Sequence, residues 1–280
     1  MLCIMTECIH KINIIELNDT YFDSICDCTY IMLCCGDNPY REQRVIRELS
    51  KLKPTKTVKL FYFNGFKKCG RRSPTEDAFH SQRLIFEDAI KNGFKRILFL
   101  EDDFEVHEIS ADDVKSIVAF MNDKNPDVYG LGNACIPSIG TLFKHHQRSL
   151  FNHLGMAHCV FYNQNYMRNF LDYYDKHKYV LMHDLIVAKI PNIIAYRYYK
   201  PLVCQTFPQT KNQLLSWREQ MGVCGGIAII GVRLTGLHKS FEPGYTIIYM
   251  IPYVLYSIVL IMLILVMVGL IWKIYTNQNK

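Results

Sequence analysis

The 280-residue chain has few of the features that mark exported or zinc-binding proteins. Residues 1–10 contain Glu7 and no basic segment followed by a long apolar core, so we expect no secretory signal and a cytosolic domain. The 11 cysteines lack the paired C-x-x-C spacing of a zinc site, and we expect mostly reduced, structural thiols. The net charge of +6 is mild, and the basic cluster Lys67–Arg72 has no interleaved stacking aromatics. Nucleic acid is therefore not an expected partner.

Charge is absent from a long segment near the C-terminus, where no Asp, Glu, Lys or Arg occurs between Tyr245 and Trp272. The twenty residues Tyr253–Trp272 would form a helix about 30 Å long, which is the thickness of a hydrocarbon core. We therefore expect a single transmembrane helix over 245–273, a tail anchor that leaves the preceding domain in the cytosol and 274–280 as a short tail. A buried helix of a soluble protein is the alternative.

Strands and helices alternate through the first half of the chain. Apolar segments of strand length are Tyr30–Cys35, Thr57–Phe63 and Arg96–Leu100, and helical patterns lie between them at 40–52 and 74–92. This order predicts an α/β fold with a mostly parallel sheet. We place an N-terminal extension at 1–27, the main domain at 28–215, and a linker or interfacial segment at 216–244.

Three consecutive acidic residues follow the strand predicted over Arg96–Leu100: Glu101, Asp102 and Asp103. Open α/β sheets bind ligands at the carboxyl ends of their strands. Carboxylates this close repel one another, and Mg²⁺ or Mn²⁺ would neutralise them and could also hold a diphosphate. Strand alternation places Glu101 and Asp103 on one face. We therefore expect Asp103 to be a metal ligand, and Glu101 to contact the metal or a ribose. A strand end capped by solvated acids is the alternative.

Several segments, in the right order, resemble motifs of glycosyltransferase family 25, which includes bacterial lipooligosaccharide glycosyltransferases and collagen galactosyltransferases. They are Tyr30–Leu33 followed by Arg41 and Arg44, Ala78–Gln82 with Ile85–Ala89, Ile97–Asp103 (close to LILEDD), Met182–Leu185, and Pro201–Gln205. The resemblance spans roughly 28–210. It implies a type A glycosyltransferase fold, which is Rossmann-like, together with metal dependence and inversion at the anomeric carbon.

The resemblance also implies partners and residue roles. The expected donor is a nucleotide sugar, most simply a UDP-sugar, and the expected acceptor is a hydroxyl of a glycan or protein. Asp184 is the candidate general base, or else a carboxylate that orients the acceptor, and His183 is a candidate further ligand of Mn²⁺ or Mg²⁺, although both could simply begin a helix. Arg41 and Arg44 could pair with the nucleotide phosphates, or be exposed arginines of a helix. Gln205 is carried over as a donor-binding residue.

Two other functions compete with sugar transfer. The family's Ser-His pair is replaced here by Ser81-Gln82, with His80 before the serine, which favours a non-catalytic, membrane-tethered binding or scaffold protein. A metal phosphohydrolase would share the acidic strand end, but it needs a second cluster of ligands near the first. The sequence offers only His183-Asp184 for that cluster.

Overall fold

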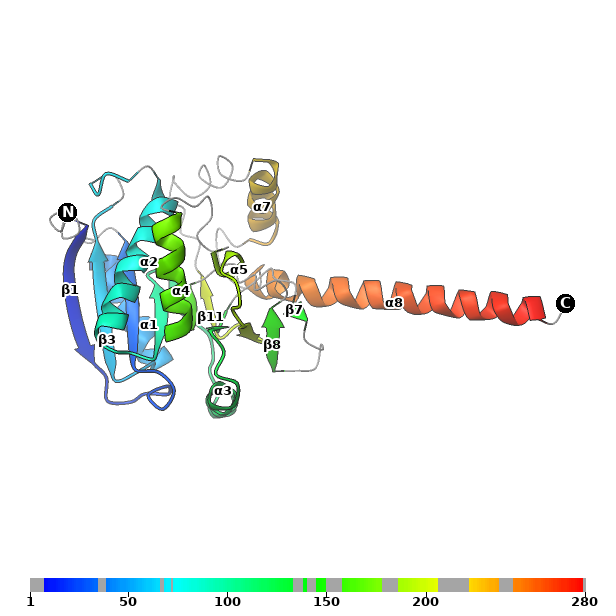
Figure 1. The fold of residues 1–280 in the computed structure, drawn as a ribbon, viewed down its shortest axis with the longest axis horizontal. Coiled ribbons are helices and arrows are strands. Elements are labelled where there is room, and N and C mark those ends of the chain that lie inside the picture. Colours follow the sequence, from blue (N-terminus) through cyan, green and yellow to red (C-terminus); the bar gives the residue numbers. More distant parts are fainter. Residues whose placement is uncertain are drawn as a thin grey trace.

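The computed structural model describes residues 8–34, 39–65, 68–71, 73–132, 138–139, 145–149, 158–177, 186–205, 222–236 and 244–278. Within these ranges, a nine-stranded sheet has the order β1-β3-β2-β4-β9-β6-β10-β8-β7, and β5 and β11 form a separate two-stranded sheet. Figure 1 shows the sheet and its helices at one end of the molecule, with α8 extending away from them.

The elements have the following bounds. The strands are β1 (Ile9–Glu16), β2 (Cys28–Cys34), β3 (Thr57–Phe63), β4 (Arg96–Glu101), β5 (Phe104–Val106), β6 (Val128–Gly130), β7 (Ser138–Ile139), β8 (His146–Ser149), β9 (Cys159–Asn163), β10 (Ala195–Tyr198) and β11 (Val203–Gln205). The helices are α1 (Pro39–Leu52), α2 (Pro74–Lys91), α3 (Ala111–Lys124), α4 (Gln164–Lys176), α5 (Ile186–Lys189), α7 (Val223–Leu234) and α8 (Gly244–Gln278).

The first half of the chain forms the parallel unit that its alternation predicts. β2 pairs in parallel with both β3 and β4, so that Met32 lies between Phe61 and Glu101. The helices α1 and α2 provide the crossovers that parallel neighbours require. The helix α2 begins where its sequence predicts, because the Ser73 side chain accepts a hydrogen bond from the Glu76 amide.

The expectation of a mostly parallel sheet is wrong. Five of the eight strand pairings in the large sheet are antiparallel, including those of β9 with β4 and with β6. Antiparallel neighbours, unlike parallel ones, need no crossover helix between them. The segment predicted as an N-terminal extension contains β1, which pairs antiparallel with β3.

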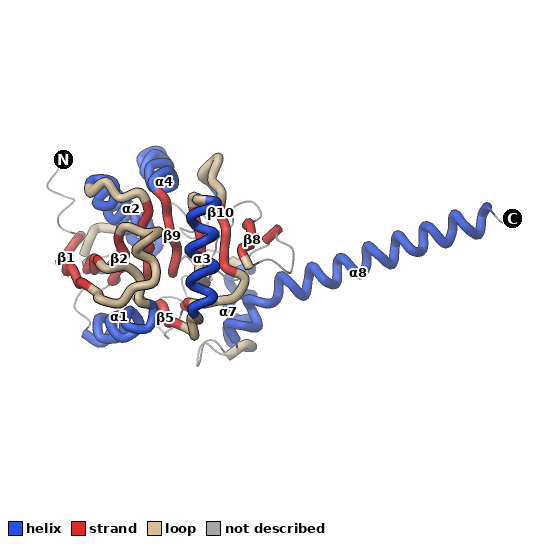
Figure 2. The backbone as a smooth tube through the Cα atoms, turned by 90° about the horizontal axis from the view of Figure 1, so that it is seen from below, coloured by secondary structure: helices blue, strands red, loops and turns tan. Residues whose placement is uncertain are grey.

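Helices pack on both faces of the sheet and bury two separate cores. Figure 2 shows α2 and α4 on one side of the strands and α1 on the other. Phe79 and Phe86 of α2 belong to the first core, together with Phe99 of β4. Val45 of α1 and Ile117 of α3 belong to the second. Both faces of the buried central strands are therefore apolar, and for this reason the sequences of these strands are continuous hydrophobic runs.

The predicted transmembrane helix is not supported. Within the described ranges, no helix combines the length and apolar character needed to cross a membrane. The fold class is therefore corrected to a mixed α/β fold. The first turn of α8 packs on the domain, where the hydroxyl of the buried Tyr245 donates a hydrogen bond to the Gly132 carbonyl.

Candidate functional site

The acidic residues lie at the carboxyl end of a central strand, as predicted. Glu101 is the last residue of β4, and Asp102 and Asp103 form the turn that leads into β5. The strand β5 pairs antiparallel with β11, which brings Gln205 opposite Phe104. The acidic turn is therefore fixed between the large sheet and the small one.

Asp103 has a strongly perturbed carboxyl. Its Oδ1 is buried, and its Oδ2 accepts a hydrogen bond of 2.9 Å from Nε2 of Gln205. Burial raises the pKa of Asp103 well above its usual value, and the carboxylates of Glu101 and Asp102 raise the pKa further. This raised pKa means that negative charge at Asp103 is unfavourable as the site stands, so a cation bound there would be strongly attracted.

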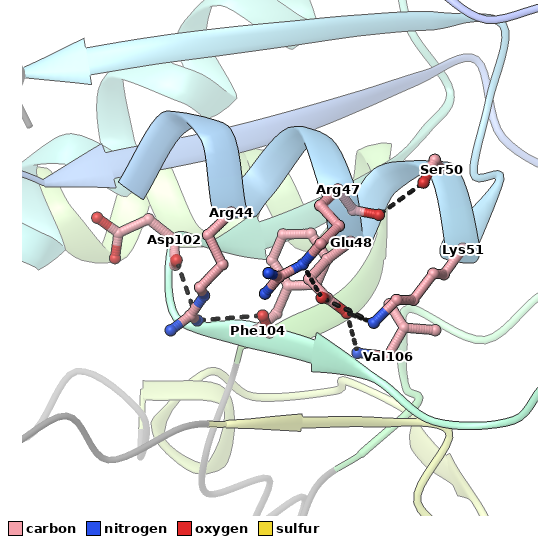
Figure 3. A network of polar contacts seen from close by, with 8 residues as sticks. All are labelled: Arg44, Arg47, Glu48, Ser50, Lys51, Asp102, Phe104 and Val106. Atoms are coloured by element: carbon pink, nitrogen blue, oxygen red, sulfur yellow. Dashed lines mark hydrogen bonds and ion pairs between the residues drawn. The ribbon is translucent and has the colours of Figure 1, made fainter. Parts of the chain in front are cut away.

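Arg41 and Arg44 both reach the acidic turn from α1. Nη1 of Arg41 forms an ion pair of 2.6 Å with Oδ2 of Asp102. Nη2 of Arg44 donates to the backbone carbonyls of Asp102, at 3.4 Å, and Phe104, at 3.2 Å (Figure 3). In the structure the two arginines hold the turn, and Asp102 is the residue that is directed to α1.

A buried carboxylate on α1 completes the attachment of the turn. Glu48 is 1% exposed, and its Oε2 accepts a 3.0 Å hydrogen bond from the amide of Val106 in β5 (Figure 3). Its oxygens also accept from Lys51, at 2.9 and 3.0 Å, and from Arg47, at 3.2 Å. The helix α1 therefore holds both ends of the segment that follows β4.

The described residues fit a divalent cation only in part. They contain no group of three or more His, Cys, Asp or Glu side chains placed to hold a metal ion. Since Asp102 is paired with Arg41, the carboxylates that would face a cation are those of Glu101 and Asp103. Mg²⁺ is commonly bound by one or two carboxylates together with substrate phosphates. These two carboxylates therefore suit a metal ion that is also bound by a diphosphate, rather than one that is held by protein ligands alone.

Two predicted residues, His183 and Asp184, lie outside the described residues. Of the remaining predictions, the structure brings Glu101, Asp103 and Gln205 together. The contact of Gln205 is with Asp103 itself, which the sequence does not reveal, since a bond between residues 102 positions apart leaves no local signal.

Comparisons with known proteins give the chain no family. No family model and no curated protein matches it. Among solved structures, it is similar to A197 from STIV, with 13% identity and a TM-score of 0.38 over 61% of this chain and 80% of that one. It is also similar to a glycosyltransferase involved in the glycosylation of the major capsid of PBCV-1, with 12% identity and a TM-score of 0.40 over 70% of this chain and 99% of that one. Neither likeness is close enough to assign an activity, and membership of glycosyltransferase family 25 is not shown.

Proposed function

We propose that this protein is a glycosyltransferase that moves a sugar from a nucleotide sugar, most simply a UDP-sugar, to a hydroxyl of a glycan or protein. The observation that carries the proposal is the buried Asp103 carboxyl beside Glu101, at the carboxyl end of a central parallel strand. That edge of an α/β sheet is where nucleotides bind. A divalent cation bound there would neutralise both this shared negative charge and the charge of a diphosphate.

The reaction needs a stabilised leaving group and a base. The acceptor oxygen forms a bond to the anomeric carbon while the bond from that carbon to the diphosphate breaks, and the acceptor proton passes to a base. Mn²⁺ or Mg²⁺ would supply Lewis-acid stabilisation of the departing diphosphate. Asp103 and Glu101 would hold that cation, and Gln205 positions Asp103. Attack from the face opposite the leaving group would invert the anomeric centre.

The general base, the additional metal ligand and the arginines that would bind the phosphates are assigned from the sequence pattern. Asp184 is the proposed base and His183 the proposed additional metal ligand. Arg44 donates to two backbone carbonyls of the acidic turn, and Arg41 is 31% exposed beside it, so a diphosphate at the turn would lie within their positive field. In this role both arginines would attract the donor while they hold the turn.

The proposal is tested by donor binding to the full chain, followed by thermal shift. A panel of UDP- and GDP-sugars is added with and without Mn²⁺, to the wild type and to Asp103→Asn. We expect one donor class to raise the melting temperature, only with Mn²⁺ and only when Asp103 is intact. Asp112→Asn, which removes an exposed carboxylate at the start of α3, is the matched control and should respond like the wild type.

Turnover then separates sugar transfer from its rivals. Transfer predicts release of the nucleoside diphosphate in step with glycosylation of an acceptor, and a large loss of kcat in Asp184→Asn. Metal-dependent release of inorganic phosphate from simple phosphate esters would instead indicate a phosphohydrolase. A folded wild-type protein that binds no donor under any condition would favour a non-catalytic binding protein.

A further inference from the structure

A second polar cluster lies at the first turns of α2, away from the acidic turn. It consists of Arg71, Asp77 and His80. Asp77 is 7% exposed, and its Oδ1 is buried without a hydrogen-bond partner among the described residues. Nε of Arg71 is buried and unpartnered in the same way. Because buried polar atoms without partners destabilise a fold, the pair indicates groups that a bound molecule completes.

The neighbouring side chains are already engaged with other partners. Nδ1 of His80 is 2.8 Å from the hydroxyl of Tyr174, and Arg83 forms a 2.7 Å ion pair with Glu87. Burial, with the positive charges of Arg71 and Arg83, lowers the pKa of His80 to about 4, so this ring is neutral at pH 7. For Asp77 burial acts in the other direction and raises the pKa to about 6, while the positive charge of Arg71 opposes that shift.

The cluster and the acidic turn lie at the same edge of the sheet. The helix α2 follows the parallel strand β3, and it therefore begins at the carboxyl end of the strands. Phe61 of β3 and Glu101 of β4 are the neighbours of Met32 on either side, so they lie two strand spacings apart, or about 10 Å. Phe79 of α2 shares a core with Met32 and Phe61, which places α2 on the face to which they point.

We propose that Asp77 and Arg71 bind the uracil base of the donor, which would make the protein selective for uridine diphosphate sugars. This inference rests on the proposed function, and it names the part of the donor that the acidic turn does not hold. N3–H of uracil would donate to Oδ1 of Asp77, and an adjacent carbonyl of the base would accept from Nε of Arg71. A ribose and the diphosphate would then bridge the distance from the cluster to the acidic turn.

The pattern of donors and acceptors selects uracil over the other bases. Cytosine presents an acceptor at N3, which would face the Asp77 carboxylate and be repelled. Guanine presents two donors side by side and would need two acceptor oxygens, whereas uracil needs one, and Oδ1 of Asp77 is a buried oxygen without a hydrogen-bond partner among the described residues. Uracil has one donor between two carbonyls and matches one carboxylate oxygen beside one guanidinium N–H.

The test is titration of the full chain with UDP, CDP and GDP in the presence of Mn²⁺. We expect the wild type to prefer UDP over CDP by about ten- to a hundredfold, the range of one hydrogen bond to a charged group. Asp77→Asn should weaken UDP binding by a similar factor and abolish the preference, since an amide can donate to N3 of cytosine. Its melting temperature without ligand should be no lower than that of the wild type, because the variant removes a buried charge.

Two further variants keep the result interpretable. Glu76→Gln removes the neighbouring carboxylate and should leave the preference unchanged. Arg71→Gln, in a partly exposed loop residue, should weaken UDP more than tenfold even if Asp77→Asn fails to fold. If the wild type binds UDP in a manner that depends on Mn²⁺ and Asp103 but not on Asp77 or Arg71, or prefers GDP, the base assignment is overturned while the proposed function stands. If no nucleoside diphosphate binds at all, the proposed function itself fails.

Discussion

Gly132 lies directly against the backbone of Val203, so that a Cβ placed on this glycine would come within 1.6 Å of the Val203 carbonyl oxygen. This Cβ would also lie 2.8 Å from Nε2 of His158, and that nitrogen is itself 3.0 Å from the Val203 carbonyl oxygen. The segment after β6 therefore packs on β11 without room for a side chain. Since β11 carries Gln205, this close approach helps to fix the position of the candidate site.

Gly132→Ala should destabilise the protein severely. The clash is with backbone atoms, which cannot rotate away, so we expect a loss of about 3 kcal/mol or more in the free energy of unfolding. Urea denaturation measures the loss. Gly226→Ala in α7 is the control, because a Cβ there meets no atom within 4 Å and alanine favours a helix. A Gly132→Ala protein as stable as the wild type would show that the backbones of Gly132 and Val203 are not in contact.

Gln205→Glu should destabilise the protein in a way that divalent cations reverse. The substitution keeps the shape but replaces the N–H donor to Asp103 with a third carboxylate beside Asp103 and Glu101. Losing a hydrogen bond to a charged group costs about 1.5–3 kcal/mol. We expect a lower melting temperature in EDTA and a recovery in Mn²⁺ that is larger than that of the wild type. Equal responses to Mn²⁺ in the two proteins would contradict a cation site at this turn.

The parallel half of the fold could be predicted from the sequence because its signals are local. The strand Thr57–Phe63 and the helix beginning at Pro74 are found where apolar patterns and the Ser73 cap place them. The short strand β8 could not be predicted. The strand β8, His146–Ser149, lies in a basic, His-rich segment whose sequence is typical of a loop. It is a strand because it pairs with β10, and its own residues do not favour that conformation.

The candidate site could be predicted in position but not in its internal contacts. Glu101 and Asp103 follow an apolar run, and this is enough to place them at a sheet edge. The roles of Arg41 and Gln205 depend instead on partners 61 and 102 positions away, and no spacing in the sequence encodes such contacts. The same holds for Asp77, whose unpartnered oxygen can be recognised only once burial is known.

Glu48→Gln should weaken the link between α1 and β5, and the loss should depend on pH. Burial alone would raise the pKa of Glu48, but the Val106 amide and the Lys51 and Arg47 side chains outweigh burial and lower it. A carboxyl whose pKa is lower in the folded state stabilises the fold above its unfolded pKa, near 4.3, and this contribution is lost as the pH falls through the lower folded value. We therefore expect a loss of about 1–2 kcal/mol at pH 7 that shrinks progressively below about pH 4.

Urea denaturation of the wild type and Glu48→Gln at pH 7 and at pH 3.5 measures this difference. The control is Glu42→Gln, in the first turn of the same helix, whose carboxylate interacts with Tyr62 of β3. If Glu48→Gln lost the same free energy at both pH values, the ionised carboxylate would not be what joins α1 to β5. In that case the acidic turn would depend on Arg41, Arg44 and Gln205 for its position, and the Gln205→Glu variant would be the more destabilised of the two at every pH.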